Sequence, residues 1–283
     1  MQKEEQIDEI INRALAEDLS SGDITTDTLI SENWRGKAQV VVKAAGVLAG
    51  IEIARRVFLK VDPEIRMHVL IQDGTNVKPG DVAALVEGKF SGILKAERTA
   101  MNFLQHLSGV ASETARYVEA VKGLRVKILD TRKTLPGLRV LEKYAVRMGG
   151  GHNHRMCLGD SVLIKDNHLA VLINQGLSLK EIVAKARREA PAHLKVEVEV
   201  KTPEETLQAT EAGADIVMLD NMGLEAMRQA VRLVKGRALI EASGGITLAN
   251  VWAVAEIGVD FISIGAITHS ARALDISLEF EER

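Results

Sequence analysis

The clearest strand in this chain is KVEVEV, residues 195–200, in which valines alternate with charged residues without a break. A period of two places the valines on one face of the strand and the charged side chains on the other. In a barrel, one face meets the surrounding helices and the other faces the lumen, so we expect Glu197 and Glu199 to point inward. The same alternation also fits an amphipathic edge strand with solvated glutamates, because half-exposed strands commonly alternate in this way.

Five other short apolar runs flank this strand along the sequence, and helical stretches separate several of them. The runs are 125–129, 162–164, 216–219, 238–240 and 261–264. The helical stretches are 179–189, 203–212, 224–233 and 249–257. Alternation of strands and helices predicts parallel strands with right-handed crossovers, hence a barrel or a doubly wound sheet. Six strands are fewer than the eight of a complete (β/α)₈ barrel.

Polar residues crowd the ends of these predicted strands. The segments concerned are DTRK (130–133), KDNH (165–168), DN (220–221), EASGG (241–245) and GA (265–266). In barrels the carboxyl ends of the strands carry the active site, and the loops after the last two strands often hold a phosphate. This placement favours a barrel over a doubly wound sheet.

The N-terminal part of the chain does not alternate in this simple way, which predicts an α+β domain. We expect helices over 4–18, 51–60 and 93–122, the last interrupted near Ser108-Gly109, and strands over 37–45, 65–71 and 82–86. The predicted domains are 1–108, with residues 275–283 free to pack back on it, and 109–274.

The composition limits the classes of partner. Apolar residues make up 46% and charged residues 27%, an ordinary globular balance, and the net charge of -3 gives no global attraction to nucleic acid or to a membrane surface. Cys157 is the only cysteine, so no intramolecular disulfide can form, and we expect it to be a small buried apolar group. No segment has the character of a signal peptide or a membrane span, so we expect a cytoplasmic protein.

Glycines after the last two strands could cradle a phosphate. Ser243-Gly244-Gly245 follows one strand and Gly265 follows the next, and both turns offer backbone N–H groups without side-chain obstruction. A helix starting near Leu248 would add a favourable dipole. Such glycines also serve ordinary tight turns, but two turns of this kind on consecutive strands favour the phosphate site.

The segment GGGHNHR (149–155) combines a flexible run with two imidazoles and a guanidinium. A His-x-His pair suggests a metal site, but no third ligand lies nearby in the sequence and Arg155 would repel a cation. An anion-binding loop fits better, because arginine offers a carboxylate two parallel hydrogen bonds, although a solvated basic loop is also consistent. Lys165, at another strand end, could form a Schiff base or bind a phosphate or carboxylate.

Nine motifs in the same order resemble the family of quinolinate phosphoribosyltransferases, the carboxylating nicotinate-nucleotide pyrophosphorylases. The motifs are GDITT (22–26), ERTAMNFLQ (97–105), DTRKTLPGLR (130–139), GGGHNHR (149–155), IKDNH (164–168), VEVEV (196–200), MLDN (218–221), EASGGI (241–246) and IGAITHS (264–270). The resemblance implies an α/β protein, with an N-terminal α+β open-faced sandwich domain and an incomplete TIM-like barrel. It also implies a homodimer with shared active sites, or a larger assembly.

The resemblance further assigns roles to individual residues. It places Arg132, His154, Arg155 and Lys165 around the carboxylates of quinolinate, with Arg98 reaching into the partner subunit's site. It places Lys133, Lys165, Glu199 and Asp220 around the ribose and pyrophosphate of phosphoribosyl pyrophosphate, with Lys133, Glu199 and Asp220 as the catalytic groups. Ser243, Gly244, Gly245 and Gly265 correspond to the 5′-phosphate cradle. Mg²⁺ is expected to arrive mainly with the substrate, with Glu199 and Asp220 as candidate direct ligands.

The implied activity is a pentosyl transfer in NAD biosynthesis, from phosphoribosyl pyrophosphate to quinolinate with loss of CO₂, giving nicotinate mononucleotide. The main alternative is a paralogue on the same scaffold, of the molybdenum-transport-associated type, with another substrate. A lyase that uses a Lys165 Schiff base and a non-catalytic binding barrel are further alternatives, and so many inward charges would be costly in the latter.

Overall fold

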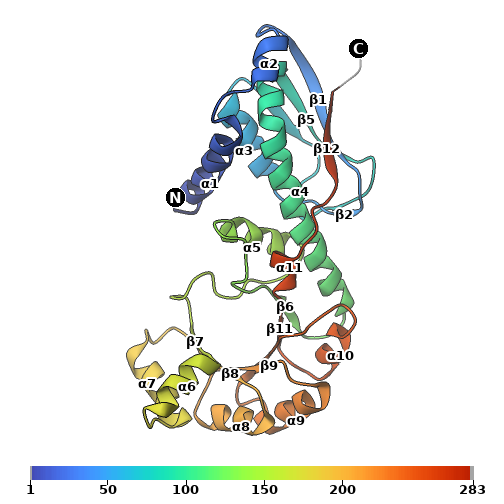
Figure 1. The fold of residues 1–283 in the computed structure, drawn as a ribbon. Coiled ribbons are helices and arrows are strands. Elements are labelled where there is room, and N and C mark those ends of the chain that lie inside the picture. Colours follow the sequence, from blue (N-terminus) through green and yellow to red (C-terminus); the bar gives the residue numbers. More distant parts are fainter. Residues whose placement is uncertain (1, 281–283) are drawn as a thin grey trace. The chain divides into compact units, whose positions relative to one another are not determined.

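The structure is a computed structural model that describes residues 2–280 (Figure 1). The chain divides into two compact units, each assembled from separate segments. The first, here called the sandwich unit, comprises the residues up to Ala115, residues 133–150 and the residues from Ala266 onward. The second, the barrel unit, comprises residues 116–132 and 151–265. The domain boundary predicted after residue 108 stays a prediction.

The sandwich unit contains an antiparallel sheet with the strand order β12-β1-β5-β3. Its strands are β1 (Arg35–Val42), β3 (Arg66–Val69), β5 (Val82–Lys89) and β12 (Ile276–Phe280), and a separate small pair joins β2 (Gly46–Val47) and β4 (Asn76–Val77). Strand β12 comes from the far end of the sequence and runs beside β1, with Ile276 opposite Val42 (Figure 1). The rest of the predicted C-terminal tail, residues 281–283, lies outside the described residues.

The helices of this unit begin where the sequence supplies a cap or an apolar face. They are α1 (Gln2–Leu19), α2 (Ile24–Leu29), α3 (Ile51–Val61), α4 (Phe90–Ala120, which continues into the barrel unit), α5 (Arg139–Met148) and α11 (Ala266–His269). Asp23 caps α2, because its carboxylate accepts the N–H of Thr26 at 3.0 Å. The predicted helices at 4–18 and 51–60 are confirmed, whereas α2 and α5 were not predicted.

Helix α4 runs without a break, so the predicted interruption near Ser108-Gly109 is wrong. Both residues instead permit close packing. The hydroxyl of Ser108 accepts the N–H of Ala49 at 3.0 Å, and a Cβ on Gly109 would lie 2.1 Å from the carbonyl oxygen of Arg272. Small residues are therefore needed at this point, because the neighbouring backbone packs directly against the helix and a larger side chain would prevent that contact.

The barrel unit contains a parallel sheet with the strand order β6-β11-β10-β9-β8-β7. The strands are β6 (Lys127–Leu129), β7 (Val162–Ile164), β8 (Val196–Val200), β9 (Ile216–Asp220), β10 (Leu239–Ser243) and β11 (Phe261–Ser263). All six predicted strands are therefore present. Within the described residues β6 and β7 are the two edges of the sheet, which leaves the barrel incomplete, as predicted.

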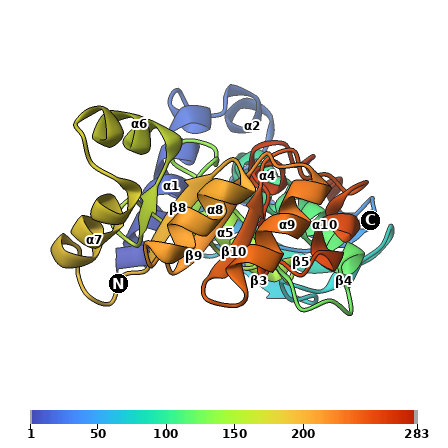
Figure 2. The same ribbon diagram turned by 90° about the horizontal axis from the view of Figure 1, so that it is seen from below.

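Helices line the outside of this sheet. They are α6 (Asp166–Asn174), α7 (Leu179–Glu189), α8 (Pro203–Glu211), α9 (Leu224–Val234) and α10 (Val251–Glu256). Figure 2 shows α8, α9 and α10 in a row beside strands β8 to β10. Ser178 and Glu181 form a capping box at the start of α7, and Thr202 caps α8 with Pro203 in its first turn. No helix within residues 2–280 is long and apolar enough to cross a membrane.

Candidate active site

The alternation of strand β8 directs both of its glutamates into the barrel. Glu197 is 2% exposed and Glu199 is 9% exposed, so neither is solvated. Strand β8 lies between β7 and β9 rather than at an edge of the sheet, so the alternative of a solvated edge strand is wrong. Strand β10 also buries a glutamate, because Glu241 has 1% of its surface exposed.

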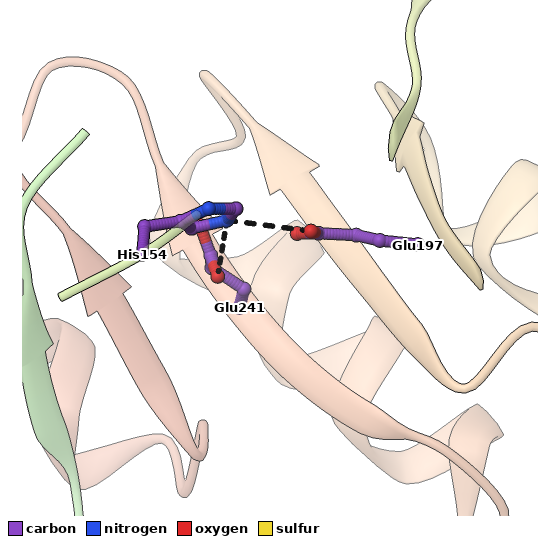
Figure 3. A group of neighbouring side chains, drawn as sticks. All are labelled: His154, Glu197 and Glu241. Atoms are coloured by element: carbon purple, nitrogen blue, oxygen red, sulfur yellow. Dashed lines mark ion pairs between the residues drawn. The ribbon is translucent and has the colours of Figure 1, made fainter. Parts of the chain in front are cut away.

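Glu197 and Glu241 meet at the imidazole of His154 (Figure 3). Nε2 of His154 lies 3.3 Å from a carboxylate oxygen of Glu197 and 3.5 Å from one of Glu241. Burial lowers the pKa of His154, but the hydrogen bonds and charges of the two glutamates outweigh it and raise that pKa to about 10. Two buried carboxylates that share one imidazole therefore retain a proton that separate groups in water would release at neutral pH.

The other ring nitrogen of His154 also has a partner. Nδ1 lies 2.8 Å from the backbone nitrogen of Arg155, which donates a hydrogen bond to it. Burial raises the pKa of Glu197 above its usual range, so the imidazole and the two carboxylates titrate as one coupled group. One ligand atom from each of these three residues lies within 4.8 Å of the others, a spacing that could also hold a metal ion.

Asp130 fixes the segment that carries this histidine. Its carboxylate is fully buried immediately after β6, and it accepts the N–H of His154 at 2.8 Å and the side-chain amide of Asn153 at 2.5 Å. The same segment runs along the outer edge of β6, because the N–H of His152 donates to the carbonyl of Ile128 at 2.8 Å. Two of the three predicted guanidinium groups, Arg132 and Arg155, thus belong to segments that pair with one another.

The positively charged side chains at this end of the barrel repel one another unless an anion binds between them. Burial and the nearby positive charge of Arg132 lower the pKa of the Arg155 guanidinium. Arg155 also donates a hydrogen bond to the carbonyl of Ser161 at 3.2 Å, which restricts its position. Lys165, which directly follows β7, places its Nζ 3.7 Å from Glu199. Two guanidinium groups and an ammonium in one region suit a ligand with more than one carboxylate.

Glu199 and Asp220 come from neighbouring strands, β8 and β9. Burial raises the pKa of Glu199, and the negative charges of Asp220 and Asp166 raise it further, while Lys165 opposes them. Mg²⁺ is commonly bound by one or two carboxylates together with phosphate oxygens of a substrate. Glu199 and Asp220 offer two carboxylates, which are the kind and number of protein ligands that such a Mg²⁺ site uses.

The predicted phosphate cradle has the backbone geometry that only glycine adopts readily. Gly244 and Gly245 have φ angles of +83° and +64°. A Cβ on Gly244 would lie 2.4 Å from the side-chain oxygen of Asn221, so the turn after β10 packs directly on the turn after β9. The predicted helix start near Leu248 is wrong, because α10 begins at Val251. Asn250 holds the intervening turn, since its side chain accepts the N–H of Thr247 at 2.8 Å.

A cavity of about 370 Å³ lies beside the Glu197 and Glu241 pair. Its lining includes Lys127, Ile216 and Phe261, which are the first residues of β6, β9 and β11. The predicted quinolinate residues His154 and Arg155 also line it, so these two groups border a cavity that reaches the amino ends of the strands.

The barrel unit contains most of the predicted site residues. These residues are Arg132, His154, Arg155, Lys165, Glu199, Asp220, Ser243, Gly244, Gly245 and Gly265. Arg98 and Lys133 belong to the sandwich unit. Cys157 is exposed rather than buried, because its turn is built around Asp160, which accepts the N–H of Met156 at 2.7 Å.

Two residues of the site were noted only as polar residues at strand ends, and no role was predicted for them from the sequence. Asp130 is the first residue after strand β6. Glu241 lies two positions before Ser243 on β10, so both side chains are on the same face of that strand. Applying the period of two to residues 239–243, as for residues 195–200, would have found Glu241.

The sequence matches two protein-domain families that follow one another. Residues 23–108 match the quinolinate phosphoribosyl transferase N-terminal domain, and residues 110–279 match the quinolinate phosphoribosyl transferase C-terminal domain. Together the two matches cover most of the chain.

Similar full-length proteins have names that agree with these families. The chain is 39% identical to a probable carboxylating nicotinate-nucleotide pyrophosphorylase of Bacillus subtilis, over 97% of this chain and 93% of that protein. It is 41% identical to a carboxylating nicotinate-nucleotide pyrophosphorylase of Mycobacterium leprae, over 95% of both. The crystal structure of NadC from Streptococcus pyogenes superposes with a TM-score of 0.92 at 43% identity, over 98% of each chain.

Proposed function

The chain belongs to the quinolinate phosphoribosyltransferase family, and we propose on this basis that it transfers phosphoribose from phosphoribosyl pyrophosphate to quinolinate. The products are nicotinate mononucleotide, pyrophosphate and CO₂, and the reaction is a step of NAD biosynthesis. The observation that carries the proposal is that both domain families match in order over residues 23–108 and 110–279. The full-length relatives described above are pyrophosphorylases of the carboxylating type, which gives no support to the alternative of another substrate on this scaffold.

The cationic end of the barrel supports a dicarboxylate substrate. We assign Arg132, Arg155 and Lys165 to the two carboxylates of quinolinate, since guanidinium groups pair with carboxylates in a bidentate manner. His154 contributes through the protein, because one ring nitrogen accepts the Arg155 N–H and the other faces Glu197 and Glu241. Its imidazole therefore orients the backbone of Arg155 toward the substrate.

The acidic groups support the sugar half of the reaction. As pyrophosphate departs, C1 of the ribose gains positive charge, and the carboxylates of Glu199 and Asp220 would stabilise it electrostatically. The pyridine nitrogen bonds to C1 and becomes positively charged. That charge stabilises the electron pair left on the ring carbon when the neighbouring carboxylate leaves as CO₂, and a proton then replaces the carboxylate. The turns at Ser243-Gly244-Gly245 and Gly265 would bind the 5′-phosphate.

Three parts of the proposal rest on the family alone. Lys133 would bind the pyrophosphate side of phosphoribosyl pyrophosphate, and Arg98 would complete the quinolinate site of a partner subunit in a homodimer. Mg²⁺, held by the substrate with Glu199 and Asp220 as candidate ligands, would neutralise charge on the departing pyrophosphate. We also propose a cytoplasmic location, consistent with the single cysteine of the chain.

Product formation tests the function directly. The protein is incubated with phosphoribosyl pyrophosphate, Mg²⁺ and either quinolinate, nicotinate or nicotinamide, and the nucleotide and CO₂ are quantified. We expect nicotinate mononucleotide and an equal amount of CO₂ from quinolinate, and no nucleotide from the other two acceptors. A folded protein that turns over none of them, or that prefers nicotinate, would contradict the proposal.

A further inference from the structure

The sandwich unit contains a buried carboxylate to which the proposed mechanism gives no role. Glu142, on helix α5, is 0% exposed. One of its oxygens lies 2.8 Å from Nε2 of His106 on helix α4, and the other accepts the backbone N–H of Leu135 at 3.2 Å. A carboxylate is costly to bury, so a fully buried one whose two oxygens both have partners suggests a specific task.

The partner Leu135 lies in the segment that carries Lys133. Two other hydrogen bonds hold the same segment. The hydroxyl of Thr268, on α11, donates to the carbonyl of Lys133 at 2.8 Å, and Nε of Arg139 donates to the hydroxyl of Thr134 at 3.0 Å. Three consecutive residues, 133 to 135, are therefore each tethered by a side chain of α5 or α11. Residues 133–135 belong to no strand, so these side chains hold the segment together with turn hydrogen bonds such as that from the N–H of Leu138 to the carbonyl of Leu135 at 3.1 Å.

We propose that Glu142, together with His106, is a positioning residue that sets the backbone around Lys133 and so aims its ammonium group at phosphoribosyl pyrophosphate. The inference rests on the proposed function, because it concerns the binding of that substrate. Rigid support of this kind matters for a flexible side chain such as lysine, since binding groups must be held close to their productive geometry. A purely structural Glu142 would stabilise the unit without affecting one substrate more than the other.

The primary experiment compares the Michaelis constants for the two substrates. For Glu142→Ala we expect the KM for phosphoribosyl pyrophosphate to rise about tenfold, corresponding to about 1.4 kcal/mol, while the KM for quinolinate changes less than about twofold. Glu142→Gln keeps one oxygen that can accept the Leu135 N–H, so we expect it to restore most of the affinity. Equal increases in both KM values, or no increase in either, would overturn the proposal.

Tyr144→Phe is the matched control on the same helix. Tyr144 donates a hydrogen bond to Asp73 at 2.6 Å, and its loss should lower the free energy of unfolding without changing either KM. If Tyr144→Phe raises the KM for phosphoribosyl pyrophosphate as much as Glu142→Ala does, destabilisation of α5 is sufficient and the positioning role is wrong.

A double-mutant cycle tests whether Glu142 acts through Lys133. Once Lys133→Ala has removed the ammonium group, Glu142→Ala should add less than about twofold to the loss of affinity, since the two act as a unit. If the losses of affinity from Lys133→Ala and Glu142→Ala multiply in the double variant, the two residues act independently and the proposal is contradicted. If Glu142→Ala does not fold, Thr268→Val removes a neighbouring tether at nearly constant shape and should produce the same selective rise in KM.

Calorimetric binding of phosphoribosyl pyrophosphate separates this proposal from the proposed reaction. Wild-type protein that binds the substrate without turnover would contradict the reaction, while the variants could still be ranked by affinity. Wild-type protein with turnover, and variants with unchanged affinity, would contradict only the role of Glu142.

Discussion

Both oxygens of the Asp130 carboxylate accept hydrogen bonds from the segment that contains His154, one from the His154 backbone N–H at 2.8 Å and the other from the Asn153 side chain at 2.5 Å. Asp130 ends strand β6, whereas His154 lies beyond helix α5 in the sequence. The pairing therefore joins two loops that carry the predicted guanidinium groups Arg132 and Arg155. It makes the geometry of the proposed quinolinate pocket depend on a residue with no assigned contact to substrate.

Asp130→Asn should weaken the use of quinolinate. The substituted amide cannot accept from Asn153 in the same geometry, so we expect the free energy of unfolding to fall by about 1–3 kcal/mol. We expect the KM for quinolinate to rise about tenfold, which corresponds to about 1.4 kcal/mol. Asp260→Asn is the matched control, because Asp260 accepts the N–H of Ile240 at 2.8 Å near the opposite end of the strands. It should lower stability without changing that KM, and a similar KM effect in both variants would argue against a local role of Asp130.

The cluster around His154 should make stability fall as the pH rises above neutrality. The folded-state pKa of His154, about 10, exceeds the unfolded value near 6.5, so the folded protein binds more protons between these values. Stability from this source is therefore complete below about pH 6.5 and is lost as the pH rises through about 10. In His154→Gln the slope of unfolding free energy between pH 7 and 9, measured with urea, should be flatter than in wild type. The exposed His193→Gln is the control, and unchanged slopes in both variants would contradict the prediction.

Gly244→Ala should impair phosphoribosyl pyrophosphate selectively. The new Cβ would lie 2.4 Å from the Asn221 side chain at a φ of +83°, so the turn must shift. We expect the KM for phosphoribosyl pyrophosphate to rise at least about tenfold, with little effect on that for quinolinate. Gly258→Ala has a similarly positive φ of +94° but no atom within 4 Å, and it should cost about 1–2 kcal/mol of stability without a kinetic effect. Equal kinetic losses from both variants would point to backbone strain in general.

Glu199→Gln should make the protein more stable and less active. Because burial raises the pKa of Glu199, its ionised form opposes folding once the pH exceeds its folded-state value. The variant should therefore be more resistant to urea than wild type at pH 8, and this advantage should shrink as the pH falls toward the unfolded value near 4.3. We expect kcat to fall on the order of 100-fold, as expected for losing an electrostatic group in a transition state. A variant that is less stable than wild type at pH 8 would show that the Lys165 pair outweighs burial.

Mixing two inactive variants would test the shared site of the proposed homodimer. Arg132→Ala should reduce kcat/KM for quinolinate on the order of 100-fold or more, because a buried charge pair loses one partner. If Arg98 serves the partner subunit's site, a heterodimer of Arg98→Ala and Arg132→Ala subunits contains one intact site. Purified heterodimers should then recover about half of the wild-type activity, as symmetry requires. Absence of recovery in verified heterodimers would place Arg98 in the site of its own subunit.

Local patterns predicted most of the fold. The alternation in residues 195–200 and the apolar runs around it identified all six barrel strands, since burial of one face imposes that period. The errors occurred where a small polar residue serves tertiary packing. Ser108 and Gly109 suggest a helix break when only the neighbouring sequence is considered, yet the helix is continuous. Ser108 accepts a hydrogen bond from the N–H of Ala49, and Gly109 packs against the backbone at Arg272.

The sequence alone determined the family, the order of the strands along the chain and the residue types at each strand end, because these depend on local periodicity and on contiguous motifs. Only the tertiary structure decided the partners of the buried charges. Glu241 faces His154, and Glu142 faces His106, across 87 and 36 positions of sequence. Such pairings follow from the order of strands in the sheet and from helix packing, which bring together side chains that no local pattern links. The protonation of His154 depends on these pairings, since its pKa is set by neighbouring charges and burial.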